Sequence, residues 1–335
     1  QTPNPKPQTP NPIKVLIRSP KLKMTHKMIF GNNKQMSSKH NINTEERSGK
    51  TGPAQSGEKK QPPAFVVPGN PGITREEFDD LYSMQQKSIK QEVEKEPMIS
   101  SIIDTSLLVF EFENQPNFVK KVNFVIEKFG KKKLRKVRRD GSCFYRAFIY
   151  RLAEVMLEEK SGSTVKGLLA KIPEVNSLLK KVGFEELVFD DFEDACIEFL
   201  ERISLKNTTL EIVTAIFSDK TYFDYLVMYL RFAISAFVRS CPLFENYFES
   251  DKDIKNFCTR EVEPIDCEAD HIQITALFNL LNVPLRIFYI DNTEQEEPTV
   301  LSLPEIEKGV KAVNDSISKY PIQIMYRPGH YDLLY

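Results

Sequence analysis

The chain has 335 residues, and 46 Lys and Arg against 47 Asp and Glu leave a formal net charge of −1. No stretch reaches the roughly 18 to 20 consecutive apolar residues that a membrane helix requires, and the five cysteines include no C-x-x-C pair. These features argue against a membrane protein, a disulfide framework and a zinc module. We expect a cytoplasmic protein with free thiols, for which the nucleus is also a compatible compartment.

Residues 1–70 differ from the rest of the chain in composition. They hold 10 of the 21 prolines but only Phe30 and Phe65 of the 35 Phe and Tyr residues, and QTPNP occurs at 1–5 and again at 8–12. With 12 Lys and Arg against 3 Asp and Glu, they carry a formal +9, so the remaining residues carry −10. We expect a disordered, basic, low-complexity tail. Such a tail suits nucleic acid, an anionic membrane or the acidic domain itself, and a solvated tail without a specific partner fits equally well.

Residues 71–98 are predicted to form a helical arm. Thr74 and Glu77 have the spacing of a capping box ahead of EFDDLYSMQQKSIKQEVEKE, so a helix should begin near these residues. The helix is mostly polar, and its apolar residues are Phe78, Leu81, Met84, Ile89 and Val93. Because so sparse a stripe fills a core poorly, we expect this helix to lie on the surface or to dock a partner.

Residues 99–335 are predicted to be one α+β domain in which helices precede strands. Apolar periodicity predicts helices directly after Cys143 and at 117–129, 174–182, 188–204, 208–217 and 222–240. Asp270 is a suitable N-cap for a further helix, HIQITALFNLL. β-Branched and aromatic residues predict strands in VPLRIFYI, PIQIMY and HYDLLY. Pro328 and Gly329 favour a tight connection, so 322–335 is expected to form a hairpin on the edge of a small sheet.

Cys143 and His330 are the candidates for nucleophilic chemistry. Cys143 follows a Gly-containing loop, begins a helix and comes after the basic run KKKLRKVRR, and all three features favour a thiolate. Free N–H groups of Cys143 and of the loop from Asp140 to Ser142 are placed to hold an oxyanion. His330 precedes Asp332 by two residues, so in a strand the carboxylate can orient the imidazole. Spacing alone leaves open that Cys143 is a packed small residue and that the His-x-Asp pair arises by chance.

Four segments in chain order resemble the otubains, a family of deubiquitinating cysteine proteases of the ovarian-tumour class. They are DGSCFYRAF (140–148), SDKTYFDYLVMYLRFAISAFV (218–238), EVEPIDCEADHIQITALFNLLNVPLRIFYID (261–291) and YRPGHYDLLY (326–335). The resemblance implies a papain-like fold, in which a mainly helical part packs on a small mixed β-sheet and the helix bearing the cysteine faces the strand bearing the histidine.

The resemblance also implies a role for each residue of the motifs. Cys143 would be the nucleophile, His330 the general base and acid, and Asp332 the residue that orients the imidazole. Asp140 would shape the oxyanion loop, and neither a metal nor another cofactor is needed. Otubains usually carry Asn before the nucleophile, whereas this chain has Ser142. The departure matters little if the loop acts through its backbone amides, and more if the side chain stabilises the loop.

The implied partners are ubiquitin and polyubiquitin chains, cleaved at lysine isopeptide bonds. The arm at 71–98 would bind a second ubiquitin and favour the linkage that marks proteins for the proteasome. The segment that is similar to the distal ubiquitin site of otubains contains Glu263, Pro264, Ile265 and Asp266, for which a solvated loop is the alternative. For His271 the main interpretation is a structural role at the start of a helix, and the alternative is a contact with ubiquitin.

The alternative function is a non-catalytic one. The resemblance also allows a protein that binds ubiquitin and ubiquitin-conjugating enzymes and thereby inhibits conjugation. An intact set of Cys, His and Asp argues against a purely non-catalytic role. Neither function requires nucleic acid or a membrane.

Overall fold

The computed structural model describes residues 74–159, 161–304 and 320–335. The basic tail predicted at 1–70 lies outside the described residues. Within them, no helix has both the length and the apolar character that crossing a membrane demands. Of the described residues, 74–91 belong to a unit separate from Glu92–Tyr335, so helix α3 (Arg75–Lys95), most of which lies in the first unit, is described on its own.

Helix α3 confirms the helix predicted for the arm. The N–H of Thr74 donates to Oε2 of Glu77 (2.8 Å), and the N–H of Glu77 donates to Oγ1 of Thr74 (3.3 Å), which is the reciprocal pair of a capping box. None of the α3 residues is buried, and Leu81 and Met84 are 55% and 67% exposed. The helix therefore keeps its apolar side chains accessible.

Six strands of the described residues form one mixed sheet in the order β1-β2-β6-β5-β3-β4. They are β1 (Ile103–Asp104), β2 (Lys133–Arg135), β3 (Leu285–Tyr289), β4 (Thr299–Leu303), β5 (Ile322–Arg327) and β6 (His330–Leu334). Strands β3 and β5 are parallel, and the other neighbours are antiparallel. The predicted C-terminal hairpin is confirmed as β5 and β6. Its predicted place at the sheet edge was wrong, because β2 pairs with β6 and β3 pairs with β5.

Strand β2 lies within the basic run KKKLRKVRR and was not predicted. Leu134 is buried at 0% exposure, whereas Lys133 is exposed and pairs with Asp104 at 3.3 Å. Val137, further along the run, is buried as well. Because basic residues surround Leu134 and Val137, the sequence shows no clear alternation of apolar and polar residues here, and the buried positions are identified only from the paired strand.

Helices α4 (Leu107–Glu111) and α5 (Pro116–Phe129) pack on one side of the sheet. The core between them and the strands contains Leu108, Phe118, Val122, Val125, Leu134, Phe288, Ile290, Met325 and Leu334. Helix α5 begins at a proline, whose missing N–H would have had no acceptor within the helix. It ends at Phe129, and the C-cap residue Gly130 is in the left-handed conformation with φ of +68°.

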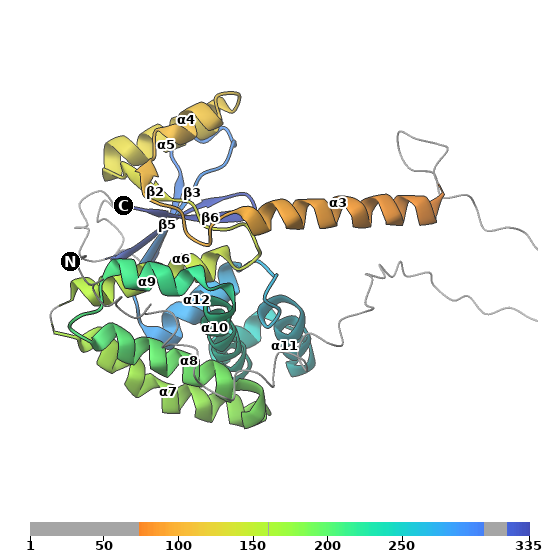
Figure 1. Ribbon diagram of the computed structural model, residues 1–335. Coiled ribbons are helices and arrows are strands. Elements are labelled where there is room, and N and C mark those ends of the chain that lie inside the picture. The colour runs from red at the N-terminus through yellow and green to blue at the C-terminus, as the bar shows by residue number, and fades with distance from the viewer. Residues whose placement is uncertain (1–73, 160, 305–319) are drawn as a thin grey trace, which may run out of the picture. The chain divides into compact units, whose positions relative to one another are not determined.

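The larger helical layer lies on the other side of the sheet (Figure 1). It contains α6 (Cys143–Glu158), α7 (Ser163–Lys181), α8 (Glu186–Ser204), α9 (Leu210–Ser218), α10 (Lys220–Ser240) and α12 (His271–Leu281). Between α10 and α12 are the unpredicted 3-10 helix η2 (Pro242–Tyr247), helix α11 (Asp251–Phe257) and π-helix η3 (Cys258–Val262). Phe144 on α6 packs edge-on against Tyr331 on β6, with 5.3 Å between ring centroids, so α6 contacts the hairpin. The predicted α+β architecture, with a mainly helical part on a small mixed sheet, is confirmed.

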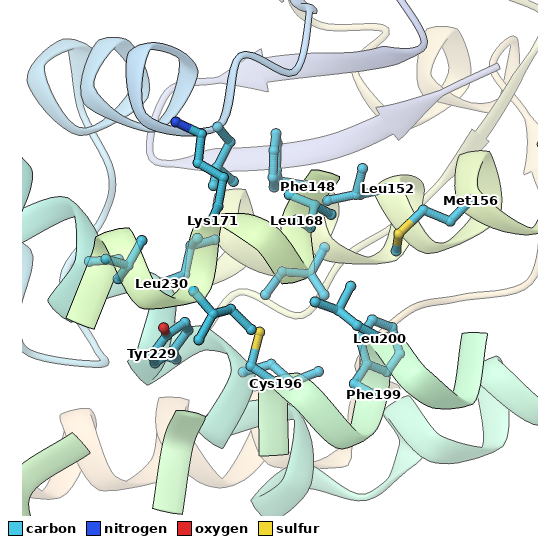
Figure 2. A pocket seen from close by; sticks show the side chains of 16 residues that line it. Phe148, Leu152, Met156, Leu168, Lys171, Cys196, Phe199, Leu200, Tyr229 and Leu230 are labelled. Carbon is cyan, nitrogen blue, oxygen red and sulfur yellow. The ribbon is translucent and has the colours of Figure 1, made fainter. Parts of the chain in front are cut away.

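A cavity of about 80 Å³ lies among α6, α7, α8 and α10 (Figure 2). Its lining includes the apolar side chains of Phe148, Leu200 and Leu226, and the thiol of Cys196 lies among them. Burial raises the pKa of Cys196 to about 12, so this thiol is a packed, neutral side chain. The residues predicted to be catalytic do not line the cavity.

Candidate active site

Gly141 fixes the loop that leads into Cys143, the first residue of α6. Its φ is +77°, a conformation that other L-residues rarely adopt. A Cβ on Gly141 would lie 2.1 Å from the backbone oxygen of Asp266. Glycine is therefore required both by the backbone conformation and by the close approach of the chain at Asp266.

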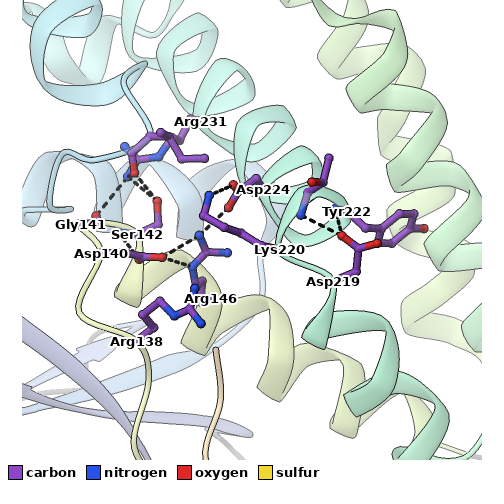
Figure 3. A network of polar contacts seen from close by, with 12 residues as sticks. Arg138, Asp140, Gly141, Ser142, Arg146, Asp219, Lys220, Tyr222, Asp224 and Arg231 are labelled. Carbon is purple, nitrogen blue, oxygen red and sulfur yellow. Dashed lines mark hydrogen bonds and ion pairs between the residues drawn. The ribbon is translucent and has the colours of Figure 1, made fainter. Parts of the chain in front are cut away.

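Asp140 is held through both of its carboxylate oxygens. Oδ1 accepts from the N–H of Ser142 (3.1 Å), and Oδ2 accepts from Nε of Arg146 (2.9 Å). Arg146 also pairs with Asp224 at 2.5 Å, and Asp224 pairs with Lys220. This network, drawn in Figure 3, ties the loop to α6 and α10. Asp140 thus lies where it can shape the loop, and its part in catalysis stays a prediction.

His330 and Asp332 contact each other at the start of β6. Nε2 of His330 is 2.8 Å from Oδ1 of Asp332, which confirms that the two side chains share one face of the strand. The N–H of Val137 donates to the same oxygen (3.0 Å), and Arg327 donates to Oδ2 (2.8 Å). Burial alone would raise the pKa of Asp332. The hydrogen bond and charge of His330, the charge of Arg327 and the Val137 amide together hold that pKa below its usual value. The carboxylate is therefore ionised at neutral pH.

The second ring nitrogen of His330 is the candidate base. Nδ1 is buried and has no hydrogen-bond partner among the described residues. Because Asp332 contacts Nε2, a neutral ring carries its proton on Nε2 and leaves the lone pair on Nδ1. The backbone amide of Tyr331, the next residue, interacts with the sulfur of Cys143. This interaction brings the start of β6 beside the start of α6.

Cys143 is a neutral thiol in this structure. It is 2% exposed, and burial raises the pKa of its thiol to about 12. The amide of Tyr331 opposes this rise, whereas the negative charges of Asp140, Glu268 and Asp332 add to it. The thiolate expected from the sequence was therefore wrong for the free chain, because the cost of desolvating the anion dominates.

The basic run does not act on Cys143 as predicted. Arg138 donates to the backbone oxygen of Glu96 (2.8 Å), and Arg139 pairs with the Glu96 carboxylate at 2.6 Å. The side-chain charges that shift the pKa of Cys143 are all acidic. Proximity in sequence was misleading here, because these two arginines pair with Glu96, in the segment that follows α3.

The loop also offers fewer free amides than predicted. The N–H of Ser142 donates to Asp140, and the N–H of Asp140 donates to the backbone oxygen of Arg138 (3.1 Å). The N–H of Cys143 belongs to the first turn of α6, where an amide has no acceptor within the helix. The Cys143 amide is therefore the one best placed to hold an oxyanion.

Ser142 stabilises the loop through its side chain. It is fully buried, and its hydroxyl donates to the backbone oxygen of Ile265 at 2.5 Å. Although this chain has Ser142 where otubains usually carry Asn, the serine side chain still joins the loop to the distant segment that contains Ile265.

The segment predicted to contact ubiquitin lies against the nucleophile loop. Ile265 and Asp266 meet that loop through their backbone oxygens. Glu263 accepts a hydrogen bond from the hydroxyl of Ser235 (2.7 Å). Pro264 lies between Glu263 and Ile265 in the chain. The segment is therefore next to the candidate nucleophile, and its contact with ubiquitin stays a prediction.

His271 begins α12, as predicted from its position after Asp270. The carboxylate of Asp270 accepts from the N–H of His271 (2.7 Å), and a reciprocal pair with Gln273 completes a capping box. The side chain of His271 is exposed. Its role at the helix start is confirmed, and a role toward ubiquitin stays a prediction.

Three arginines of this region were not predicted: Arg146, Arg231 and Arg327. Arg231 had a signal in VMYLRFAIS, because a charged residue there occupies a position that the helical period assigns to the apolar face. Arg327 stands in the YRPGH motif, but its bond to Asp332 depends on the register in which β5 pairs with β6. Arg146 follows the nucleophile by three residues, and nothing in the sequence connects it to Asp224.

The arrangement provides a thiol, a base with a free lone pair, a carboxylate that orients the base, and an amide at a helix start. These groups suit acyl transfer through a thiol. Among the described residues, no group of three or more His, Cys, Asp and Glu side chains gathers in a way that would hold a metal ion.

Alkylation of Cys143 by iodoacetamide without ubiquitin is expected to accelerate beyond about pH 10, because the thiolate is the reactive form. A thiol with a pKa of about 12 holds about a thousandfold less thiolate at neutral pH than one with a pKa of 9.0. Mass spectrometry of the peptide containing Cys143 gives the rate, and Cys241 in the same digest is the reference thiol. A rate that levels off near neutral pH would contradict burial as the dominant influence.

The family model Peptidase C65 Otubain matches residues 91–335. Ubiquitin thioesterase OTUB1 of Homo sapiens is 33% identical over 268 residues, which cover 79% of this chain and 93% of that protein. The otubain-like ubiquitin thioesterase of Caenorhabditis elegans is 30% identical over 259 residues, which cover 76% of this chain and 87% of that protein.

Solved structures are similar as well. A ceOTUB1 chain, in a complex with ubiquitin aldehyde and UBC13~Ub, aligns with a TM-score of 0.65 and 28% identity over 75% of this chain and 98% of that chain. An h/ceOTUB1 chain, in a complex with ubiquitin aldehyde and UBCH5B~Ub, aligns with a TM-score of 0.65 over 77% of this chain and 98% of that chain. With the family model covering most of its length, the chain belongs to the otubain family of C65 peptidases.

Proposed function

We propose that this otubain is a cysteine isopeptidase that releases ubiquitin from lysine side chains. The observation that carries the proposal is the arrangement of His330, whose Nδ1 is buried without a described partner while Asp332 holds Nε2 and Cys143 lies beside the same strand. Thiol proteases cleave amides with these groups. The relatives named ubiquitin thioesterases support ubiquitin as the group that is transferred.

The reaction starts from the protonated thiol of Cys143. Nδ1 of His330 takes the proton of Cys143 as the sulfur attacks the carbonyl carbon of the C-terminal glycine of ubiquitin. Coupling proton transfer to attack avoids a free thiolate at a site where burial and acidic neighbours disfavour that anion. The ionised Asp332 stabilises the imidazolium that results.

The imidazolium of His330 then gives its proton to the leaving lysine amine, and the C–N bond breaks. The product is a thioester between Cys143 and ubiquitin. A water molecule, deprotonated by His330, attacks the thioester and releases the ubiquitin carboxylate, and the sulfur recovers a proton. During both attacks the Cys143 amide, at the positive end of α6, stabilises the oxyanion.

Cleavage of isopeptide-linked di-ubiquitin tests the proposal. We expect the wild-type chain to release ubiquitin and Cys143→Ala to release none, because the nucleophile is gone. Cys241→Ala removes a half-buried thiol that follows α10 and should keep wild-type activity. Cleavage by Cys143→Ala would overturn the assignment of the nucleophile. Lack of cleavage by the wild type with every linkage would overturn the isopeptidase proposal.

A second candidate function is inhibition of ubiquitin conjugation by binding. Two observations favour it: Cys143 is buried in the free chain, and solved relatives are complexes with UBC13~Ub or UBCH5B~Ub. Chain synthesis by a ubiquitin-conjugating enzyme, measured with Cys143→Ala added, separates this function from catalysis. Inhibition by that variant would establish a binding role, and undiminished chain synthesis would exclude one.

We propose further that helix α3 binds a second ubiquitin and favours the linkage that directs proteins to the proteasome. Leu81 and Met84 are exposed and lie about one helical turn apart. We expect the double variant Leu81→Ser, Met84→Ser to cleave the preferred linkage about tenfold more slowly, because burial of apolar side chains against a partner contributes to binding and a few residues carry most of the binding energy. Rates measured for every linkage type check this.

Two controls make this result specific for the second ubiquitin. Hydrolysis of ubiquitin with a C-terminal fluorophore, which has no second ubiquitin, should be unchanged in the double variant. Gln85→Ser, an exposed polar position on the same helix, should keep the wild-type linkage profile. An unchanged profile in the double variant would remove α3 from linkage selection.

A further inference from the structure

Arg231 is a charged side chain in the interior of the domain. It lies on α10 and has 0% exposure, and its guanidinium carbon is 4.2 Å from the centroid of the Tyr145 ring. Among the described residues, no carboxylate oxygen is hydrogen-bonded to it. Burial of a charge without a bonded ionic partner is costly, so other contacts must stabilise this guanidinium.

One set of contacts reaches the nucleophile loop. Nη2 of Arg231 donates to the backbone oxygen of Gly141 (3.2 Å) and to the hydroxyl of Ser142 (3.0 Å), as Figure 3 shows. Gly141 and Ser142 are the two residues that precede Cys143. The guanidinium therefore restrains the backbone that sets the direction of the Cys143 amide.

A second set of contacts reaches residues 262–267. Nη1 donates to the backbone oxygen of Val262 (2.9 Å), and Nη2 donates to those of Ile265 (3.1 Å) and Cys267 (2.6 Å). The hydroxyl of Ser142 donates to the same Ile265 oxygen, which closes a ring of contacts between the two segments. Acceptors from segments far apart in the sequence thus converge on one side chain.

A guanidinium suits this arrangement because its two terminal nitrogens reach different acceptors: Nη1 meets Val262, and the two N–H groups of Nη2 are shared among the other four acceptors. The ammonium of lysine has a single nitrogen and cannot serve both sets of acceptors. Gly141 also packs against the backbone of Asp266. The nucleophile loop is therefore held both by this contact and by the hydrogen bonds of Arg231.

We propose that Arg231 is a positioning residue, which locks the nucleophile loop to residues 262–267 and thereby holds the Cys143 amide in place for the oxyanion. The inference rests on the proposed isopeptidase function. Arg231 acts through the loop backbone and not on the reacting atoms. Its loss should therefore lower kcat and leave the KM for ubiquitin nearly unchanged.

The variants Arg231→Lys and Arg231→Met test this proposal, with Arg239→Met as the matched control. Arg239 lies on the same helix, donates to the backbone oxygen of Val182 (2.6 Å) and lies 5.5 Å from the centroid of the Phe184 ring. It is thus another arginine that bonds a carbonyl and stacks on a ring, with contacts outside the nucleophile loop.

We expect both Arg231 variants to hydrolyse ubiquitin–fluorophore with a kcat about 100-fold lower, because misplacement of a catalytic group by about 1 Å costs that much. Alkylation of Cys143 by iodoacetamide forms no oxyanion and should stay within about threefold of wild type. Arg239→Met should change neither rate. A merely structural role would loosen the packing that buries Cys143, so the alkylation rate would rise while kcat fell. A lower kcat at an unchanged alkylation rate is therefore the decisive readout.

Ser142→Ala provides a second route if the Arg231 variants fail to fold. It removes one acceptor and the bond to Ile265 but keeps the guanidinium, and we expect about a tenfold lower kcat at an unchanged alkylation rate. A wild-type kcat in folded Arg231→Lys, or in Ser142→Ala where the arginine variants do not fold, would overturn the positioning role and leave the isopeptidase proposal intact. A wild-type chain that does not hydrolyse ubiquitin–fluorophore would overturn both.

Discussion

Replacement of Asp332 by asparagine is expected to lower kcat/KM for ubiquitin hydrolysis by about 10³- to 10⁴-fold, the loss typical of an orienting carboxylate in a triad. Oδ1 of Asp332 meets His330 and the amide of Val137, and Oδ2 meets Arg327. In asparagine, an NH₂ group replaces one of these two oxygens. If the NH₂ group takes the place of Oδ2, it faces the guanidinium of Arg327, which is also a hydrogen-bond donor.

Toward His330, the NH₂ group would donate to Nε2, so the proton of the ring would move to Nδ1 and the base would lose its lone pair. It would also oppose the amide of Val137. Asp291→Asn is the control, because Asp291 pairs with the buried Lys121 outside the candidate site. We expect the control to keep activity. Activity within about tenfold of wild type in a folded Asp332→Asn would contradict the orienting role.

Gly141→Ala is expected to lower kcat more than about 100-fold, because the new Cβ would lie 2.1 Å from the backbone oxygen of Asp266 and displace the loop. The side chain would also have to adopt a φ of +77°. Thermal unfolding and ubiquitin–fluorophore hydrolysis, measured on the same preparations, separate the effect on stability from the effect on the loop.

Gly130→Ala is the matched control for backbone strain. Gly130 has a φ of +68°, but a Cβ there would have no neighbour within 4 Å. This variant should lose about 1 kcal/mol of stability and keep its kcat, since it carries the strain without the clash. If Gly141→Ala behaved like Gly130→Ala, the close approach of the loop to Asp266 would not matter for catalysis.

The sequence predicted the elements that local patterns determine. Thr74 and Glu77 marked the start of α3, and Asp270 marked the start of α12, because a capping side chain acts within one helical turn. Helix α7 was predicted too short, at 174–182. The structure places Pro173 inside α7, whereas a proline normally marks a helix end. Strand β2 was missed because its basic residues conceal the buried Leu134.

Within the candidate site, too, only the contacts that a local sequence pattern determines were predictable. The contact between His330 and Asp332 follows from the two-residue period of a strand. The protonation of Cys143 does not follow from the sequence, because it depends on burial and on Glu268, which tertiary packing brings near. The contacts of Arg231 join three segments far apart in the chain, so no local pattern reveals them.

The most direct test of the proposed pair of thiol and imidazole is the reaction of the intact chain with ubiquitin that carries a C-terminal electrophile. We expect one covalent adduct, mapped by mass spectrometry to Cys143, in the wild type. Cys143→Ala should form none, and His330→Ala should react at least about 100-fold more slowly, because the base is absent. A folded wild type that binds ubiquitin but forms no adduct would contradict the isopeptidase proposal, and rapid labelling of His330→Ala would contradict the role of the histidine.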